Sequence, residues 1–323
     1  MNASGRRFID QAFKSPADGM RLLRSFLDQK TIEVAIPRAF KRSGGRLSYY
    51  ERMGGITNRN YKLILGDSTL VLRLPGRGTG RFINRAHERA NQFEAAKAGF
   101  SPEALYFNHI TGVKISTFLQ GALTLSPADV RKPERYREIA GFLGAFHSAP
   151  IRFRNNFNGF TMSKIYESVA KTRFCTFYKG YAEVRKKVFA LEAGLKELGS
   201  QRCACHNDLV PGNLLEVDGK LHLIDWEYSG MNDPAWDLAS FLLESEFPEE
   251  HALAFLRFYS GTEGIPENLY ARVRCYEVLQ DFLWSLWSLL FANANRQPDT
   301  QAFYAQYGKE RFERARSGLR EIP

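Results

Sequence analysis

The chain has 323 residues, of which 44% are hydrophobic, and its formal net charge is +10 at pH 7. A single hydrophobic core rarely grows beyond ~250 to 300 residues, so two lobes are expected. The most apolar run, Phe282 to Ala294, has 13 residues, fewer than the ~18 to 20 that span a membrane. Membrane insertion is therefore not expected. Four cysteines are too few for a disulfide framework in so long a chain and fit a reducing cytoplasm.

The charge is unevenly distributed along the chain. Residues 1–100 contain 19 Lys and Arg against 8 Asp and Glu, a net +11, whereas residues 206–250 contain 11 acidic residues against one lysine, a net −10. The basic excess is scattered and includes no basic helix interleaved with aromatic residues, which disfavours nucleic-acid binding. A polyanionic nucleotide held beside metal-binding carboxylates would use both signs of charge.

Residues 1–46 are expected to form a helical or irregular lead-in. Arg6, Arg7 and Phe8 resemble the start of a twin-arginine export signal, but charged and polar residues occupy the place where an apolar core should follow. A cytoplasmic protein is therefore expected.

The next part of the chain predicts a small antiparallel sheet and one helix. The predicted strands, rich in aliphatic residues or alternating in character, span Leu47–Met53, Tyr61–Leu65, Thr69–Leu74, Leu105–Phe107 and Val113–Phe118. A helix is predicted over Arg81–Ala98, before Gly99. Its apolar side is expected to consist of Phe82, Ala86, Phe93 and Ala96.

The second half of the chain predicts helices. Ser126 is a helix cap with Pro127 at the first helical position, and the helical pattern continues to Ser148. A hairpin of Leu214–Val217 and Leu221–Ile224 is the exception. The fold class is therefore α+β, with a sheet-containing lobe over residues 1–120 and a mostly helical lobe over residues 121–323.

A glycine-bearing loop and a buried cation mark the first lobe. The loop includes Gly54, Gly55, Thr57 and Asn58, where a backbone without Cβ atoms could fold over phosphates and donate N–H groups. A plain hairpin turn is the alternative. Arg73 lies in an apolar strand, where a cation needs an anionic partner. Glu88 on the following helix is that partner or, alternatively, a solvated charge.

The most specific pattern is H-x-D-x-x-x-x-N immediately before the hairpin. It contains His206, Asp208 and Asn213, and Asp225 follows directly after the hairpin. Phosphoryl transfer needs a carboxylate near the acceptor hydroxyl and oxygen ligands for Mg²⁺, and Asp208, Asn213 and Asp225 can converge around one hairpin. His206 is expected to brace the loop by packing and hydrogen bonding.

Cys203, Cys205 and His206 offer a second interpretation of this segment, as metal ligands. The C-x-C-H spacing lacks the usual C-x-x-C pattern and no second ligand pair follows, so buried thiols in a strand are favoured.

The order of glycine loop, strand cation, helical glutamate, H-x-D-x-x-x-x-N and Ile-Asp resembles the protein-kinase-like fold, in particular the choline/ethanolamine kinases and the aminoglycoside phosphotransferases. The resemblance covers about residues 47–318 and implies a bilobal, ATP- and Mg²⁺-dependent enzyme. By this resemblance Asp208 is the catalytic base, Asn213 and Asp225 hold Mg²⁺, and Thr57 and Asn58 touch the phosphates. Arg73 stands where protein kinases carry lysine, as in choline kinases.

Aromatic residues of the second lobe bear on the acceptor. A quaternary ammonium is recognised by aromatic faces and nearby carboxylates. Trp284 and Trp287 share one side of a helix predicted from about Asn268 to Asn295. By the resemblance, the residues that surround the ammonium group are Glu244, Trp284, Trp287, Tyr304 and Tyr307. Tyr228, three residues after Asp225, is a further aromatic candidate. Core packing is the alternative for the tryptophans.

The sequence thus predicts a phosphotransferase that moves the γ-phosphate of ATP to a small cationic alcohol, with choline as the leading acceptor. Ethanolamine and aminoglycosides remain alternative acceptors. A primary ammonium prefers carboxylates to aromatic rings, so the number of aromatic residues favours choline without deciding between the acceptors. A kinase-shaped binding module is the alternative outside catalysis.

Overall fold

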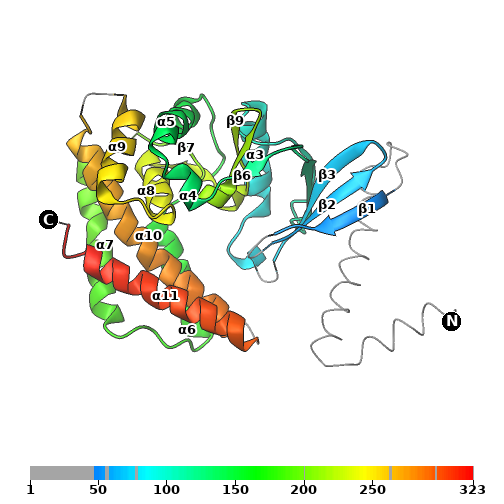
Figure 1. The fold of residues 1–323 in the computed structure, drawn as a ribbon. Coiled ribbons are helices and arrows are strands. Elements are labelled where there is room, and N and C mark those ends of the chain that lie inside the picture. The colour runs from blue at the N-terminus through cyan, green and yellow to red at the C-terminus, as the bar shows by residue number, and fades with distance from the viewer. Residues whose placement is uncertain are drawn as a thin grey trace. The chain divides into compact units, whose positions relative to one another are not determined.

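The computed structural model describes residues 47–54, 58–76, 79–199, 201–261, 264–294 and 297–322 (Figure 1). By their internal contacts, the described residues divide into two compact units. Unit 1 comprises those up to Gly76 together with Ala104–Phe118, and unit 2 comprises those of Arg77–Glu103 and of Leu119 to the C-terminus. The helix predicted after the third strand therefore falls in unit 2. The assignment of residues 1–120 and 121–323 to two lobes stays a prediction.

Unit 1 is an antiparallel five-stranded sheet with the strand order β1-β2-β3-β5-β4. Its strands are β1 (Leu47–Arg52), β2 (Arg59–Leu65), β3 (Ser68–Leu74), β4 (Ala104–Phe107) and β5 (Lys114–Thr117). In β2 every second side chain is buried, which gives the sheet one apolar face. Leu63, Leu72 and Ile115 are completely buried on it. The five predicted strands are confirmed with shifts of one or two residues at their ends.

Helix α3 (Arg85–Lys97) opens unit 2 and differs from its prediction. It begins four residues later than expected, because the side chain of Asn84 accepts hydrogen bonds from the backbone N–H groups of Ala86 and His87. The predicted apolar side was wrong, since Ala86 is exposed and Phe82, Phe93 and Ala96 are only half-buried. Its buried residues are instead Arg85, Glu88, Asn91, Gln92 and Ala95.

The remaining helices of unit 2 surround two small sheets. The helices are α4 (Pro127–Val130), α5 (Pro133–Ser148), α6 (Gly159–Thr172), α7 (Tyr181–Leu198), α8 (Pro234–Glu244), α9 (Glu249–Ser260), α10 (Glu267–Ala294) and α11 (Pro298–Gly318). The cap at Ser126 is confirmed. Its hydroxyl accepts the backbone N–H of Asp129, and the carboxylate of Asp129 accepts the backbone N–H of Ser126. Helices α10 and α11 run side by side along much of their length (Figure 1).

The two small sheets flank the H-x-D-x-x-x-x-N segment. Strand β7 (Cys203–Cys205) pairs with β10 (Gly230–Asn232), and β6 (Leu123–Thr124) pairs with the hairpin of β8 (Leu214–Val217) and β9 (Lys220–Leu223). The predicted hairpin is therefore confirmed. Among the described residues, no helix combines the length and the apolar character required to cross a membrane.

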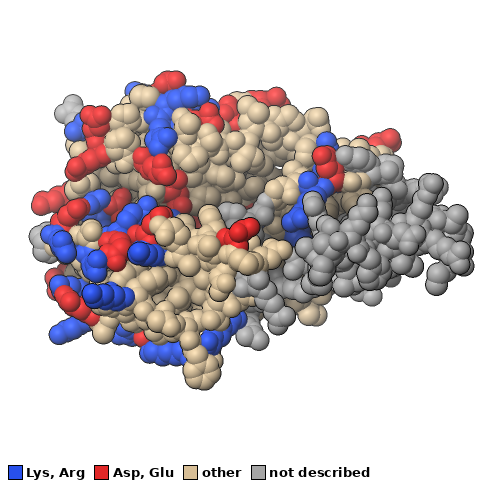
Figure 2. Space-filling view, turned by 60° about the horizontal axis from the view of Figure 1, so that its bottom comes forward, with Lys and Arg blue, Asp and Glu red and all other residues tan. Residues whose placement is uncertain are grey.

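On the face of unit 2 that Figure 2 shows, basic and acidic side chains lie among one another around uncharged areas. This face therefore carries no extended field of a single sign of the kind that favours nucleic-acid phosphates.

Candidate active site

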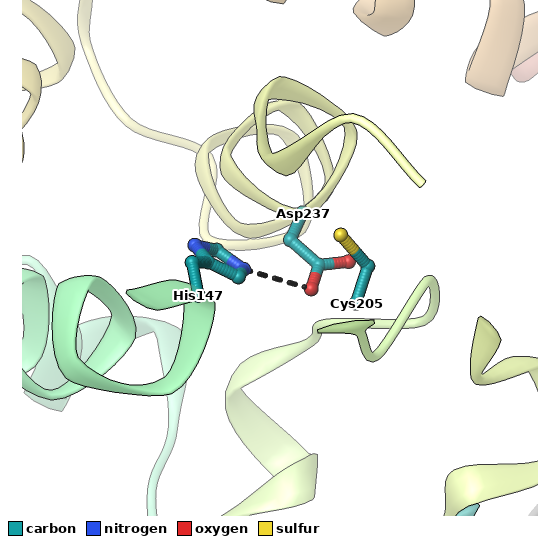
Figure 3. Close-up of side chains that lie close together, drawn as sticks. All are labelled: His147, Cys205 and Asp237. Carbon is teal, nitrogen blue, oxygen red and sulfur yellow. Dashed lines mark hydrogen bonds and ion pairs between the residues drawn. The ribbon is translucent and has the colours of Figure 1, made fainter. Parts of the chain in front are cut away.

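A loop from His206 to Asn213 connects β7 to β8, and the buried carboxylate of Asp237 on α8 holds its start. One oxygen of Asp237 accepts the backbone N–H of His206 at 2.7 Å, and the other accepts that of Asn207 at 2.7 Å. The Nε2 atom of His147 on α5 lies 3.2 Å from the first oxygen (Figure 3). Two short backbone hydrogen bonds to one fully buried carboxyl group leave the backbone few alternative positions, so this contact fixes the entry of the 206–213 loop.

Asp237 was missed by the sequence reasoning. It lies between Ala235-Trp236 and Leu238-Ala239, and an acidic residue in such an apolar helix is fully buried only when it is paired. That context was the available signal, although it does not say which groups the carboxylate meets.

Asn207 adds a second set of hydrogen bonds to the loop. Its backbone φ is +65°, a left-handed conformation that asparagine tolerates better than most residues. Its Nδ2 donates to the carbonyl of Tyr228 at 3.0 Å, and its Oδ1 accepts from Asn232 at 2.8 Å. The indole N–H of Trp236 donates to the backbone carbonyl oxygen of Asn207 at 3.1 Å. The loop is thereby tied to the chain that follows the hairpin.

His206 and Asn213, at the two ends of the 206–213 loop, make further hydrogen bonds, one to Ile224 after the hairpin and one within the loop. His206 Nε2 donates to the carbonyl oxygen of Ile224 at 2.8 Å, and the imidazole packs against the ring of Trp226, with centroids 4.9 Å apart. The Nδ2 of Asn213 donates to the backbone carbonyl of Asp208 at 2.9 Å. The bracing contacts expected of His206 are therefore present, and its imidazole faces Ile224 rather than the two neighbouring thiols.

Asp208 lies in a strongly acidic environment. Burial raises the pKa of its carboxyl group well above the usual value, and the charges of Asp225, Glu244 and Glu227 raise this pKa further. Asp225 is the largest of the charged contributors to this shift. The roles that the sequence assigns to Asp208 and Asp225 stay predictions.

Three carboxylates of unit 2 converge beside this loop. Oxygens of Glu88, Asp225 and Glu227 lie within 4.8 Å of one another. Arg85 Nη1 donates to Glu88 at 2.6 Å and to Glu227 at 2.7 Å, and all three of these side chains are almost inaccessible to solvent. A donor set made only of carboxylate oxygens fits a hard divalent cation such as Mg²⁺. Glu227 was not among the predicted site residues, and only its position two residues after Asp225 pointed to it.

The predicted phosphate-binding residues belong to unit 1. Gly55 and Thr57 lie outside the described residues. The carbonyl of Gly54 accepts from Asn60 Nδ2 at 3.1 Å, and Asn58 Oδ1 accepts the backbone N–H of Gly76 at 3.2 Å. Their contacts with phosphate stay predictions.

Arg73 is buried in β3 and faces the sheet's own neighbours. Its Nη2 donates to the carbonyl of Gly112 at 3.3 Å, and its guanidinium lies 5.5 Å from the ring centroid of Phe107. The proposed partner, Glu88, accepts from Arg85 within unit 2. The pairing of Arg73 with Glu88 stays a prediction.

Five aromatic residues of unit 2 are named here the aromatic cluster. They are Tyr228, Trp284, Trp287, Tyr304 and Tyr307. Four of them form a connected series of rings, and the ring of Phe303 links the fifth, Tyr307, to Tyr304. Ring centroids are 5.4 Å apart for Tyr228 and Trp284, 6.1 Å for Trp284 and Trp287, and 5.6 Å for Trp287 and Tyr304, all close to edge-to-face. Trp284 and Tyr304 are buried, whereas Tyr228, Trp287 and Tyr307 are partly exposed.

The aromatic cluster approaches the 206–213 loop at Tyr228 and Tyr307. Burial raises the pKa of both phenols, and the nearby charge of Asp208 raises both further. The Tyr228 hydroxyl is also hydrogen-bonded to that of Tyr166 at 3.0 Å. The cluster thus begins within electrostatic reach of Asp208 and continues along α10 and α11.

Glu244, the predicted acidic residue of this region, is already engaged by a cation. Its carboxylate accepts a hydrogen bond from Arg311 Nη2, and Arg311 Nη1 donates to Asp281 at 2.9 Å. The same guanidinium lies 5.0 Å from the ring centroid of Tyr307. A cation is therefore already placed between a carboxylate and an aromatic face at this end of the cluster.

Comparison with known proteins identifies a family that matches this chain. A protein-family model described as "Choline/ethanolamine kinase" matches residues 51–258. "Protein LicA" of Haemophilus influenzae is 28% identical over 281 residues, which are 85% of this chain and 80% of that protein.

Two solved structures resemble this chain over nearly its whole length. The crystal structure of choline kinase LicA from Streptococcus pneumoniae has a TM-score of 0.77 at 32% identity and covers 90% of this chain and 99% of its own. A structure described as LicA in complex with AMP has a TM-score of 0.77 at 31% identity and covers 91% and 98%, respectively. Both agree with the predicted kinase-like α+β fold.

Proposed function

Because the chain belongs to the choline/ethanolamine kinase family, we propose that this phosphotransferase moves the γ-phosphate of ATP to the hydroxyl of choline. The observation that carries the proposal is the continuity between Asp208 and the aromatic cluster. Asp208 follows Asn207, whose Nδ2 donates to the carbonyl of Tyr228, and the rings of the cluster extend from Tyr228 along two helices. An alcohol with a cationic end matches both features.

The form of the cluster favours a quaternary over a primary ammonium. A quaternary ammonium has no N–H to donate, so it gains little from carboxylate oxygens as hydrogen-bond acceptors and more from ring faces, at ~0.5 to 2 kcal/mol per contact. The carboxylate of Glu244 already accepts from Arg311, whereas Trp287 and Tyr307 keep part of their surface accessible. These contacts support choline before ethanolamine.

Asp208 is proposed to accept the proton of the acceptor hydroxyl. Its raised pKa makes the ionised carboxylate a stronger base than an exposed aspartate. The hydrogen bonds that Asp237 accepts, together with the one that Asn207 Nδ2 donates to Tyr228, hold the backbone beside it, which limits the cost of orienting the carboxylate toward a bound alcohol.

Asn213 and Asp225 are proposed to hold Mg²⁺, with Glu227 and Glu88 as neighbouring carboxylates. Because the Nδ2 of Asn213 is committed to the carbonyl of Asp208, the amide oxygen is the atom it can offer to a cation. When bound, the cation would offset the negative charge of the nucleotide phosphates. Arg85 keeps Glu88 and Glu227 together and stops the two carboxylates from repelling each other apart.

The nucleotide part of the proposal draws on the LicA complex with AMP and on the predicted phosphate contacts of Gly54, Gly55, Thr57, Asn58 and Arg73. A cytoplasmic location, where ATP and Mg²⁺ are available, belongs to the same proposal.

A panel of acceptors tests the function directly. The purified full chain is incubated with Mg-ATP and, separately, with choline, ethanolamine and an aminoglycoside, and ADP release is measured. The expected result is the highest kcat/KM with choline. A higher kcat/KM with ethanolamine would establish the alternative acceptor, and no ADP release above the ATP-only rate with any acceptor would favour a binding module.

A further inference from the structure

Two thiols lie in contact immediately before the 206–213 loop. Cys203 and Cys205 belong to β7, where residues two apart point to the same side of the strand, and their Sγ atoms are 3.6 Å apart. Cys203 is partly exposed and Cys205 is buried. Both are free thiols. A partly exposed thiol with a buried one in contact is the arrangement in which an oxidised first thiol can be captured by the second.

The buried thiol lies beside the groups that hold the loop. Figure 3 shows Cys205 on β7 next to Asp237 on α8, with His147 on the far side of the carboxylate. A ring nitrogen of His147, the Sγ atom of Cys205 and a carboxylate oxygen of Asp237 all lie within 4.8 Å of one another. Asp237 accepts the N–H groups of His206 and Asn207, the two residues that follow Cys205. A change in the backbone at Cys205 therefore acts directly on the contact that orients the loop.

We propose that Cys203 and Cys205 are an oxidation site, at which a peroxide forms a reversible disulfide that displaces the 206–213 loop and suppresses phosphotransfer. The Cys203 thiolate attacks a peroxide oxygen, the O–O bond breaks, and with the thiol proton a sulfenic acid and one water result. The Cys205 sulfur then attacks the sulfenic sulfur, the S–O bond breaks, and a second water leaves. In sum, two thiols and hydrogen peroxide give one disulfide and two waters.

The order of the two steps follows from exposure. Cys203 is reachable by a small oxidant, whereas burial raises the pKa of Cys205 and keeps that thiol protonated and slow to react with peroxide in solution. Once Cys203 carries the sulfenic acid, Cys205 is the sulfur already in contact with it.

Forming this disulfide requires the strand to move. An S–S bond is ~2.05 Å long, so the sulfurs must approach by about 1.5 Å from their present separation. In an extended strand, Cα atoms two residues apart are separated by about 6.6 Å, near the upper end of the range that a disulfide tolerates. This spacing exceeds the commonest value of about 5.5 to 6 Å, so closing the bond draws the ends of β7 together against its pairing with β10. Such a strained disulfide is easily reduced, which makes the modification reversible.

The loop is where this contraction has its effect. Cys205 is paired with Gly230 and is followed at once by the two N–H groups that Asp237 accepts. Because misplacing reacting groups by about 1 Å can cost roughly 10²-fold in rate, a shift of this size at Asp208 suffices to suppress turnover.

The test uses the full chain with Cys175 and Cys275 replaced by serine, which leaves Cys203 and Cys205 as the only thiols. After treatment with hydrogen peroxide, remaining thiols are alkylated and the chain is digested with trypsin. The peptide from Cys203 to Lys220 is expected to escape alkylation and to weigh about 2 Da less than its reduced form, because two hydrogens are lost. Choline-dependent ADP release is expected to fall by roughly 10²-fold and to return with dithiothreitol.

Cys203→Ser is the matched control, because it keeps the shape of the partly exposed side chain and removes only the partner sulfur. Its activity is expected to be unchanged by the same treatment when it is measured before dithiothreitol is added, because Cys205 is buried and no second thiol remains to form the disulfide. The proposal is overturned if this variant and the two-thiol protein lose activity in parallel, if the peptide remains fully alkylated, or if the disulfide forms with turnover intact.

Thermal unfolding separates this proposal from the proposed function. The oxidised two-thiol protein is expected to unfold at a lower temperature than its reduced form, whereas Cys203→Ser shows no such difference. This readout and the mass of the peptide need no turnover. If the reduced chain turns over no acceptor, the kinase assignment is contradicted, while the proposal for the thiol pair is still judged by the peptide mass and the unfolding temperature. If the disulfide forms and leaves the unfolding temperature unchanged, displacement of the loop is contradicted.

Discussion

The 206–213 loop and the aromatic cluster are built on different principles. The loop is fixed through its backbone, because the N–H groups of His206 and Asn207 both end on the single carboxylate of Asp237. The aromatic cluster is fixed through side chains, whose rings meet edge-to-face across α10 and α11. A backbone held by two charge-assisted hydrogen bonds has few alternative positions, whereas packed rings can readjust. Substitutions should therefore have large effects in the loop and graded effects in the cluster.

Asp208→Asn should produce the largest effect and sharpen the comparison. Removing the proposed proton acceptor is expected to lower kcat by ~10² to 10⁴ while the affinity for nucleotide stays nearly unchanged. Steady-state kinetics and equilibrium binding of ATP check this. Asp218→Asn, in the exposed turn between β8 and β9, is the matched control and should retain full activity. Turnover of the Asp208 variant at the wild-type rate would remove the role assigned to it.

Asp237→Asn should affect both stability and turnover. An amide has only one oxygen, so one of the two buried backbone N–H groups would face an NH₂ group instead of an acceptor. The expected cost is about 2 to 4 kcal/mol in the free energy of unfolding, with a lower kcat in the protein that remains folded. Urea unfolding and kinetics at low temperature measure the two effects. A variant with unchanged stability would show that the loop does not depend on this carboxylate.

Glu277→Gln tests whether the helix that carries the tryptophans responds to pH independently of the loop. Burial raises the pKa of Glu277 on α10 from 4.5 to about 7, although Arg274 lies 2.6 Å away and opposes the rise. The folded state therefore binds this proton more tightly than the unfolded state, and the stability of the wild type should fall as pH rises from about 4.5 to about 7.

The glutamine variant should lose this dependence, with a difference of at most about 3 kcal/mol across the window. Unfolding by urea at several pH values measures it, with Glu267→Gln, exposed on the same helix, as the control. If wild type and the Glu277 variant show parallel stability curves, the glutamate is charged in the folded protein at pH 5.

Trp287→Ala should give the smallest effect, and its result could contradict the expectation that the aromatic cluster contacts the acceptor. Loss of one partly exposed ring face is worth ~0.5 to 2 kcal/mol, so KM for choline should rise by about 2- to 30-fold, with a smaller change in KM for ATP. Phe174→Ala, which removes a ring that is 92% exposed, should change neither constant. Equal increases for choline and ATP would indicate that Trp287 packs the helices and does not contact the acceptor.

The sequence was most informative where the determinants are local. The hairpin and the H-x-D-x-x-x-x-N segment occupy one short stretch, and the contacts of His206 and Asn213 stay within it. The spacing of Trp284 and Trp287 likewise gives their shared side of α10, because positions three apart on a helix are neighbours. Their unequal burial depends on Tyr228 and Tyr304, from other parts of the chain, and could not be predicted from α10 alone.

Helix α3 shows where sequence reasoning fails. Apolarity assigned the buried side to Phe82, Ala86, Phe93 and Ala96, yet the buried side is polar. Its partners are distant in sequence, since Glu227 lies 142 residues from Arg85 and Ser229 lies 138 residues from Asn91. A buried polar side chain is stable only with such partners, and a periodicity argument cannot supply them.

The contact of Arg85 with two glutamates also sets a balance of charge. Glu88, Asp225 and Glu227 contribute −3 and Arg85 contributes +1, so these four side chains together carry −2. One divalent cation would neutralise that sum, whereas one monovalent cation would leave a net charge of −1. Replacing the arginine with a neutral residue would leave −3, a sum that one divalent ion does not neutralise.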